Sequence, residues 1–163
     1  FNAAIKDFDS VEKFTPARIS RLLQVNLNAN FILTSNMVNG MLERGFGRLV
    51  YIASKSSYYG YSTGSLYTAS KGALFQYTQS IAKDLQRTGK NVTANTLAPD
   101  AFYSREGVKA DSYRYIVQSC AYAIEGLLKT NKSGEIIPIV GTKERLIISA
   151  KQIISGIKLL FTK

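Results

Sequence analysis

A length of 163 residues fits one domain, and 45% hydrophobic with 20% charged residues is typical of a folded globular protein, which excludes a largely disordered chain. The sequence contains no histidine, which excludes histidine-based nucleophiles and histidine-ligated metals, and its single cysteine, Cys120, excludes an intrachain disulfide and favours a reducing compartment. The 21 basic and 11 acidic residues give a net charge of +10, which fits either a solvated basic surface or an anionic partner such as a phosphate-bearing ligand, a nucleic acid or an anionic membrane.

The first predicted helix covers residues 15–44. Thr15 is a favourable N-cap residue, and Pro16 is favoured at the first helical position. Apolar residues then recur at helical spacing as far as Gly45. Because residues 27–38 are apolar on several faces, we expect this part of the helix to be well buried.

A strand, a loop, a helix and a second strand are predicted next. Residues 48–53 form a short apolar run rich in strand formers, as buried parallel strands do. Residues 54–65 are dense in Ser, Tyr and Gly, which indicates a loop. Residues 66–87 have the apolar spacing of a helix that ends before Gly89, and residues 92–98 are predicted to form another strand.

The C-terminal third continues the alternation. We expect an irregular, polar segment over residues 99–111, a helix over 112–130 and a short strand over 135–140. Residues 142–163 are predicted to form a basic amphipathic helix, with Lys and Arg opposite a stripe of Leu, Ile and Phe.

This order predicts an α/β fold: a Rossmann-like, doubly wound parallel sheet with covering helices, in a single domain over residues 1–163. Three strands are few for such a sheet, and one apolar edge would lie bare. The chain also begins with Phe1 rather than Met. We therefore expect the N-terminal strands of the fold to be absent from this chain. No apolar run is long enough to cross a membrane, and the first residues do not resemble a signal peptide.

Tyr67 and Lys71 carry the main chemical signal. They lie four residues apart, on one face of the helix predicted over 66–87. An ammonium beside a phenol stabilises the phenolate and lowers its pKa, so such a tyrosine can act as a general acid or base near neutral pH. Ser54 precedes Tyr67 by thirteen residues and lies at the end of a predicted strand, where parallel sheets bind ligands.

These residues resemble the short-chain dehydrogenases/reductases, whose motif is Tyr-x-x-x-Lys at the start of a helix with a serine at the same spacing upstream, at a strand end. The surrounding sequence also resembles the family, and its further landmarks come in the expected order. The matching segments are Asn2–Ala4, Val25–Leu27, Val50–Ser54, Tyr67–Leu74 and Leu97–Pro99. The resemblance covers nearly the whole chain.

The resemblance implies an oxidoreductase that transfers hydride between NAD or NADP and a carbonyl/alcohol substrate, without a metal. Tyr67 would exchange the proton with the substrate oxygen, and Lys71 would lower the pKa of Tyr67 and bind the nicotinamide ribose. Ser54 would bind the substrate oxygen, and Asn26 would hold a water in a proton relay toward Lys71. The implied cofactor-binding residues are Asn2, Ala3, Tyr67, Lys71, Pro99 and Asp100.

The sequence departs from the family pattern in three places. The glycine-rich turn that approaches the cofactor pyrophosphate is absent, so the chain alone is expected to bind cofactor poorly. Asp100 stands where the family usually has glycine, and its carboxylate could crowd or repel the nicotinamide. Ala4 also replaces a usual glycine. A second interpretation therefore stays open: a non-catalytic remnant or interaction protein that keeps the fold but not the complete cofactor site.

Structural roles also stay open for individual residues. Tyr67 could be a half-buried aromatic with a satisfied hydroxyl, Lys71 could be a solvated helix residue, and Asn26 could be a buried structural amide. Ser56 and Ser57 compete with Ser54 for the role of binding the substrate oxygen.

The expected partners follow from the same patterns. The resemblance implies a homo-oligomer that forms through the helices predicted over 15–44 and 66–87. The helix predicted over 142–163 could lie on an anionic membrane surface or pack on its own domain. Nucleic acid is not expected, because the basic residues are scattered and no binding motif accompanies them. The expected location is the cytoplasm, with membrane association as an option.

Overall fold

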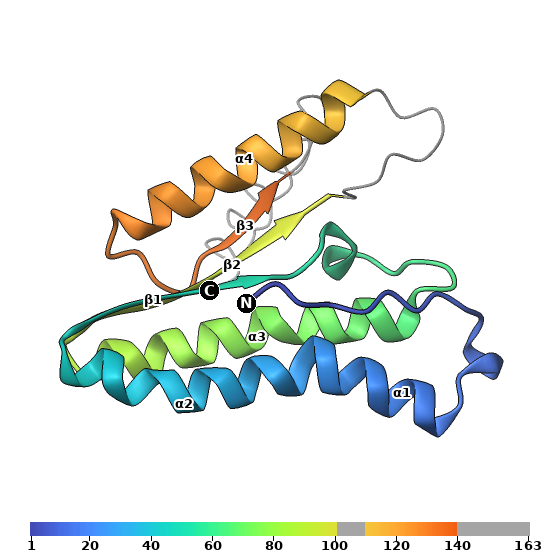
Figure 1. The fold of residues 1–163 in the computed structure, drawn as a ribbon, viewed down its shortest axis with the longest axis horizontal. Coiled ribbons are helices and arrows are strands. Elements are labelled where there is room, and N and C mark those ends of the chain that lie inside the picture. The colour runs from blue at the N-terminus through green and yellow to red at the C-terminus, as the bar shows by residue number, and fades with distance from the viewer. Residues whose placement is uncertain (101–109, 140–163) are drawn as a thin grey trace, which may run out of the picture.

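The computed structural model describes residues 1–100 and 110–139. Its regular elements alternate between helices and strands along the chain (Figure 1). In chain order they are the 3-10 helix Val11–Lys13, α1 Pro16–Leu23, the π-helix Gln24–Asn28, α2 Ala29–Glu43, β1 Phe46–Ile52, the 3-10 helix Lys55–Tyr58, α3 Ser65–Arg87, β2 Asn91–Pro99, α4 Ala110–Leu128 and β3 Ile136–Ile139.

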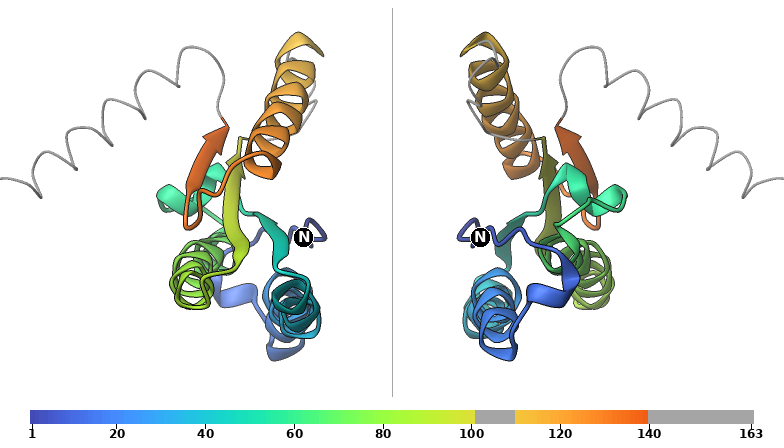
Figure 2. Two further views of the ribbon diagram at one scale, coloured as in Figure 1. Left: turned by 90° about the vertical axis from the view of Figure 1, so that its left-hand side faces the viewer. Right: turned by 90° about the vertical axis from the view of Figure 1, so that its right-hand side faces the viewer.

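The three strands form one parallel sheet in the order β1-β2-β3. Phe1 lies alongside β1, because its amino group donates to Val50 O at 3.1 Å and Ile52 N donates to Phe1 O at 3.0 Å. Helices α1, α2 and α3 lie on one side of the sheet and α4 lies on the other (Figures 1 and 2). The predicted parallel sheet with helices on both faces is confirmed.

Local sequence explains where the helices begin and end. The Oγ1 atom of Thr15 accepts a hydrogen bond from Arg18 N at 3.3 Å, as an N-cap residue does. Gly45 and Gly89 follow α2 and α3 with φ angles of 73° and 67°, which glycine adopts without the strain of a side chain. The predicted helices and strands within the described residues are confirmed to within a few residues. The helix predicted over 15–44 is interrupted by the π-helix Gln24–Asn28.

The core lies between β1, β2 and the helices α2 and α3. Leu49, Leu74 and Ala94 are fully buried there, and the Tyr51 side chain lies in the same cluster. Alternate residues of β1 are buried, as expected for a strand whose α2-facing side meets the core.

The prediction that residues 27–38 are well buried is wrong. Ile32, Leu33 and Met37 are 54%, 49% and 47% exposed. A helix packed against a sheet on one side buries only one stripe, which here runs through Asn30 and Thr34. The apolar side chains outside that stripe form a surface that we call the α2 apolar patch: Ile32, Leu33 and Met37.

Two predicted segments fall largely outside the described residues. These are the irregular segment over 99–111 and the basic amphipathic helix over 142–163. At the described ends of the first segment the prediction is wrong, because Pro99 ends β2 and residues 110 and 111 begin α4. Within the parts that the structure describes, no helix has both the length and the apolar character needed to cross a membrane.

Candidate active site

The four residues predicted to be catalytic come from three separate elements. Ser54 follows β1, Tyr67 and Lys71 lie in the first two turns of α3, and Asn26 lies in the π-helix. Lys71 reaches the end of β1, and Asn26 is bonded to Ser70 of α3. The carboxyl ends of β1 and β2 meet at this edge of the sheet, which is where α/β folds bind ligands.

Tyr67 is buried beneath the N-terminal segment. Its side chain is 7% exposed, and the ring of Phe8 lies edge-on to it at a centroid distance of 5.3 Å. The Phe8 ring also contacts Tyr61 at 5.9 Å. Phe8 and Tyr61 are themselves about half exposed, so the protein surface next to Tyr67 is partly aromatic.

Lys71 is a buried cation. It is 3% exposed, and its Nζ donates a hydrogen bond of 2.6 Å to the backbone oxygen of Ile52. Burial, with a smaller contribution from the nearby charge of Lys6, lowers the pKa of Lys71 to about 8. The group is therefore still largely an ammonium near neutral pH, although it loses its proton far more readily than an exposed lysine.

The Ser54 hydroxyl is held by the turn that follows it. Its Oγ accepts hydrogen bonds from Ser56 N at 3.2 Å and from Ser56 Oγ at 2.9 Å. The Ser54 backbone oxygen accepts from Ser57 N at 3.0 Å, which closes the 3-10 turn. The turn thus orients the side chain of Ser54 at the end of β1.

Asn26 ties the N-terminal segment to α3. Its Oδ1 accepts from Ile5 N at 2.7 Å, while its Nδ2 donates to Ile5 O at 3.0 Å and to Ser70 Oγ at 3.1 Å. Ser70 Oγ in turn donates to the backbone oxygen of Tyr67 at 2.7 Å. A continuous chain of hydrogen bonds therefore connects Ile5 to the turn of α3 that carries Tyr67.

The π-helix explains how Asn26 points inward. Ala29 N donates to Gln24 O, five residues earlier, which marks the wider π turn. This turn alters the ordinary α-helical pairing, and the backbone oxygen of Asn26 accepts from Asn30 Nδ2 at 2.8 Å. π-turns inside α-helices are frequent at functional sites.

The residues predicted to bind cofactor are in different surroundings. Asn2 and Ala3 are exposed and lie outside any helix or strand. Pro99 is buried at the end of β2. The carboxylate of Asp100 accepts from Lys55 Nζ at 2.8 Å, so the negative charge that departs from the family pattern has a neighbouring positive charge.

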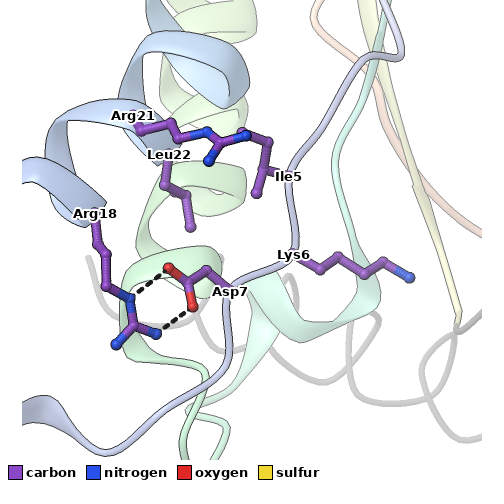
Figure 3. A pocket seen from close by; sticks show the side chains of 6 residues that line it. All are labelled: Ile5, Lys6, Asp7, Arg18, Arg21 and Leu22. Carbon is purple, nitrogen blue, oxygen red and sulfur yellow. Dashed lines mark hydrogen bonds and ion pairs between the residues drawn. The ribbon is translucent and has the colours of Figure 1, made fainter. Parts of the chain in front are cut away.

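A cavity of about 310 Å³ lies between the N-terminal segment and α1 (Figure 3). In Figure 3, Arg21 reaches across Leu22 toward Ile5, and Lys6 extends to the other side of the segment. The guanidinium of Arg18 makes a two-pronged ion pair with Asp7, one bond of which, from Nε to Oδ2, measures 3.0 Å. Through Nη1, Arg18 also bonds Asp9 at 3.1 Å.

These ion pairs have a positional consequence. The hydrogen bond from Arg18 is the main influence that lowers the pKa of Asp7, so this carboxylate stays ionised and paired at neutral pH. Asp7 and Asp9 flank Phe8. Arg18 therefore fixes both neighbours of the ring that covers Tyr67.

Sequence reasoning missed several residues that shape the site. Ser70 links Asn26 to Tyr67, Phe8 covers Tyr67, and Lys55 pairs with Asp100. A signal existed for Ser70, because it follows Tyr67 by three residues and so shares its helix face. The sequence carries no such signal for Phe8 and Lys55, since their contacts join segments that are far apart in the sequence. The described residues contain no group of three acidic or cysteine side chains that could hold a metal ion.

Comparison with known proteins decides the family. The family model described as short chain dehydrogenase matches residues 1–112. The chain belongs to the short-chain dehydrogenase family. The fold and the landmarks at Tyr67, Lys71 and Ser54 agree with this membership.

Short-chain dehydrogenases from several sources resemble the chain. A 2-dehydro-3-deoxy-L-rhamnonate dehydrogenase (NAD(+)) of Sphingomonas sp. (strain SKA58) is 38% identical over 94 residues, which are 58% of this chain and 37% of the relative. Ketoacyl reductase HetN of Nostoc sp. (strain PCC 7120 / SAG 25.82 / UTEX 2576) is 30% identical over 164 residues, covering 93% of this chain and 56% of the relative.

A solved 4-hydroxyisoleucine dehydrogenase complexed with NADH and succinate has the same fold. It superposes with a TM-score of 0.69 at 24% identity, covering 84% of this chain and 63% of that one. The chain thus matches between about a third and two thirds of the length of these relatives.

Proposed function

We propose that this chain carries the catalytic residues of an NAD- or NADP-dependent oxidoreductase that acts on a carbonyl/alcohol pair. The observation that carries the proposal is the buried pair of Tyr67 and Lys71, one helical turn apart on α3 and beside the carboxyl end of β1. Burying a lysine ammonium costs desolvation free energy unless a nearby group stabilises the charge. A phenolate one helical turn away would provide that stabilisation.

The residues present fit the nicotinamide-ribose half of such a cofactor. Within residues 1–100 and 110–139, Ile52 O is the one hydrogen-bond partner of Lys71 Nζ. A lysine ammonium has three donors, so two remain for ribose hydroxyls. We propose that Lys71 and Tyr67 hold this part of the cofactor, with Asn2, Ala3, Pro99 and Asp100 along the same sheet edge. The nicotinamide, when bound, supplies or accepts the hydride.

Three side chains of the chain would handle the substrate oxygen. In the reducing direction the hydroxyl of Tyr67 donates its proton to the carbonyl oxygen, which becomes the alcohol oxygen; in the oxidising direction the phenolate of Tyr67 takes that proton back. The positive charge of Lys71 favours the phenolate form of Tyr67. The hydroxyl of Ser54 binds the same oxygen and positions it.

Asn26 has two roles in the proposal. Its three bonds to Ile5 and Ser70 hold the N-terminal segment and α3 together. The role of holding a relay water stays a prediction, for which Oδ1 keeps one lone pair beyond the bond from Ile5 N.

The test is a titration of the full-length protein with NADH and NADPH, followed by turnover assays. 2-Dehydro-3-deoxy-L-rhamnonate, with the oxidised cofactors, and a ketoacyl thioester, with the reduced ones, are the first substrates to try, since the names of two relatives point to them. Saturable binding of one cofactor, with a change in nicotinamide absorbance on addition of substrate, supports the proposal. Failure to bind either cofactor would support the second candidate, a non-catalytic protein. The sequence observation behind that candidate is Asp100 in place of the usual glycine.

The partner and location predictions also become proposals. We propose that the α2 apolar patch (Ile32, Leu33 and Met37) forms part of a contact between copies of this chain, because water-exposed apolar side chains gathered on one helix are typical of interfaces. The predicted contact of α3 belongs to the same proposal. Membrane-surface contact through 142–163 lies outside the described residues, and the cytoplasmic location stays a prediction.

A further inference from the structure

The hydroxyl of Ser54 has no acceptor capacity left. A serine hydroxyl has two lone pairs that accept and one hydrogen that it donates. Ser56 N–H and Ser56 Oγ–H occupy both lone pairs of Ser54 Oγ, at 3.2 and 2.9 Å. Both donors belong to one residue, and the backbone bond from Ser57 N to Ser54 O fixes the turn that presents them.

We propose that Ser56 is a positioning residue that makes Ser54 a hydrogen-bond donor, aimed at the substrate oxygen. The inference rests on the proposed function and adds a residue to it. With both lone pairs taken, the only polar contact left to Ser54 Oγ is donation of its own hydrogen. A donor stabilises an oxygen that carries negative charge, whereas a hydroxyl free to rotate could equally accept from water.

This polarity matters for carbonyl chemistry. When hydride reaches the carbonyl carbon, negative charge develops on the oxygen until a proton arrives. A preoriented donor at that oxygen stabilises the charge, and no reorientation is needed as the charge forms. Hydrogen bonds accepted by a hydroxyl also polarise it, which makes its own hydrogen a stronger donor. Ser56 would therefore act on the reaction only through Ser54.

The turn around Ser56 is braced on a second side. Lys55, between the two serines, bonds the carboxylate of Asp100 at 2.8 Å and so ties the turn after β1 to the end of β2. The hydroxyl of Ser57 is buried and has no hydrogen-bond partner among the described residues. Of the two serines that compete with Ser54 in the sequence, only Ser56 bonds its hydroxyl oxygen, Oγ, in the part of the chain that the structure describes.

The first arm of the test measures geometry without turnover. In full-length protein labelled with ¹³C and ¹⁵N at serine, Ser56→Ala should shift the Cβ resonance of Ser54, because the hydroxyl loses one of its two fixed donors. Ser54→Ala should speed hydrogen exchange at the Ser56 amide. Ser56→Thr, which keeps the hydroxyl, should preserve the Ser54 resonance, and Ser62→Ala, at an exposed serine of the same loop, should leave it unchanged.

The second arm measures turnover with the cofactor and substrate found under the proposed function. Ser56→Ala should lower kcat about tenfold with little change in KM, as expected for one lost hydrogen bond that acts mainly in the transition state. Ser56→Thr should restore kcat. A residue with a merely structural role would lower stability and raise KM together, and threonine would not selectively restore kcat.

The outcomes separate the two proposals. An unmoved Ser54 resonance in Ser56→Ala, or unchanged kcat in an active enzyme, overturns the positioning role. Absence of turnover in the parent protein overturns the proposed function, and the resonance measurements then decide alone whether Ser56 orients Ser54. A shifted resonance together with a selective fall in kcat supports both.

Discussion

The side chain of Asn26 pairs with the backbone of Ile5 in both directions, as one strand pairs with another. Its Oδ1 accepts from Ile5 N at 2.7 Å and its Nδ2 donates to Ile5 O at 3.0 Å. The amide is fully buried, and its third bond reaches Ser70 of α3. One side chain thus satisfies both backbone groups of a residue that lies outside any helix or strand.

Replacing Asn26 by aspartate should destabilise the protein. The carboxylate keeps the acceptor for Ile5 N but loses both donated bonds, and it places negative charge beside Ile5 O. We expect the free energy of unfolding to fall by about 2 kcal/mol or more, as for a buried group left unsatisfied. Urea unfolding measures the change. Asn28→Asp, at an exposed position of the same π-helix, is the matched control, and equal losses in the two variants would contradict this account.

Tyr67→Phe should abolish turnover and leave the fold in place. The substitution removes only the hydroxyl, and phenylalanine retains the ring that packs edge-on against Phe8. Loss of a general acid lowers rates by about 10²–10⁴-fold. Steady-state kinetics measure the loss, while circular dichroism and thermal unfolding report the fold. Turnover near the parent rate in a folded Tyr67→Phe variant would refute the proposed proton transfer.

The stability contributed by Lys71 should rise with pH. Because its pKa falls from the ordinary 10.5 to about 8 in the folded state, the unfolded chain binds more protons between those values, and the free energy of unfolding increases as the pH rises through them. Relative to Lys71→Met, the parent should gain about 3 kcal/mol across this window.

Urea unfolding of both proteins at intervals from about pH 7 to 10.5 tests this. The same comparison with Lys83→Met, at an exposed position of α3, measures the effect of removing a solvent-facing ammonium. A parent that loses stability relative to Lys71→Met as the pH rises has the wrong sign for a buried ammonium.

Lys55 and Asp100 should be energetically coupled. Their side chains are 19% and 30% exposed, and Nζ lies 2.8 Å from Oδ2. A double-mutant cycle with Lys55→Met and Asp100→Asn should give a coupling of about 1 kcal/mol, at the upper end for partly exposed pairs. Added salt should weaken it. Additive effects of the two substitutions would show that the pair does not brace the turn that holds Ser54.

Leu33→Glu should disrupt self-association. The side chain lies in the α2 apolar patch and is 49% exposed, so a carboxylate there remains solvated in a monomer but would be buried in a contact between copies. Sedimentation equilibrium should show a shift to smaller species. Val117→Glu, at an exposed apolar residue of α4 on the opposite side of the sheet, should leave the mass unchanged. A parent that is already monomeric contradicts the interface.

The sequence was sufficient for the order of elements because each carries a local signal. Thr15 and Pro16 mark a helix start, Gly89 follows a helix end, and the apolar run before Ser54 has the composition of a buried strand. The relation of Tyr67 to Lys71 is also local, since one helical turn separates them. These features need no knowledge of which segments meet in space.

The remaining features depend on contacts between distant segments. The bonds of Asn26 to Ile5 and Ser70 span 21 and 44 residues. The sequence predicted Leu33 to be buried, whereas it is exposed. The spacing of apolar residues shows which side chains are hydrophobic, but not how many of them the adjacent sheet and helices cover. The bonds from Ser56 to Ser54 depend on side-chain rotamers within a turn, which residue spacing does not specify.

The π-helix Gln24–Asn28 makes the chain sensitive to a change of a single residue in length. One residue of an α-helix corresponds to a rotation of about 100°, so removing one residue here would rotate everything before it relative to everything after it by that angle. Asn26 and the apolar patch that begins at Ile32 could then no longer face their present directions together. The π turn thus fixes the angle about the helix axis between the buried Asn26 side chain and the exposed α2 apolar patch.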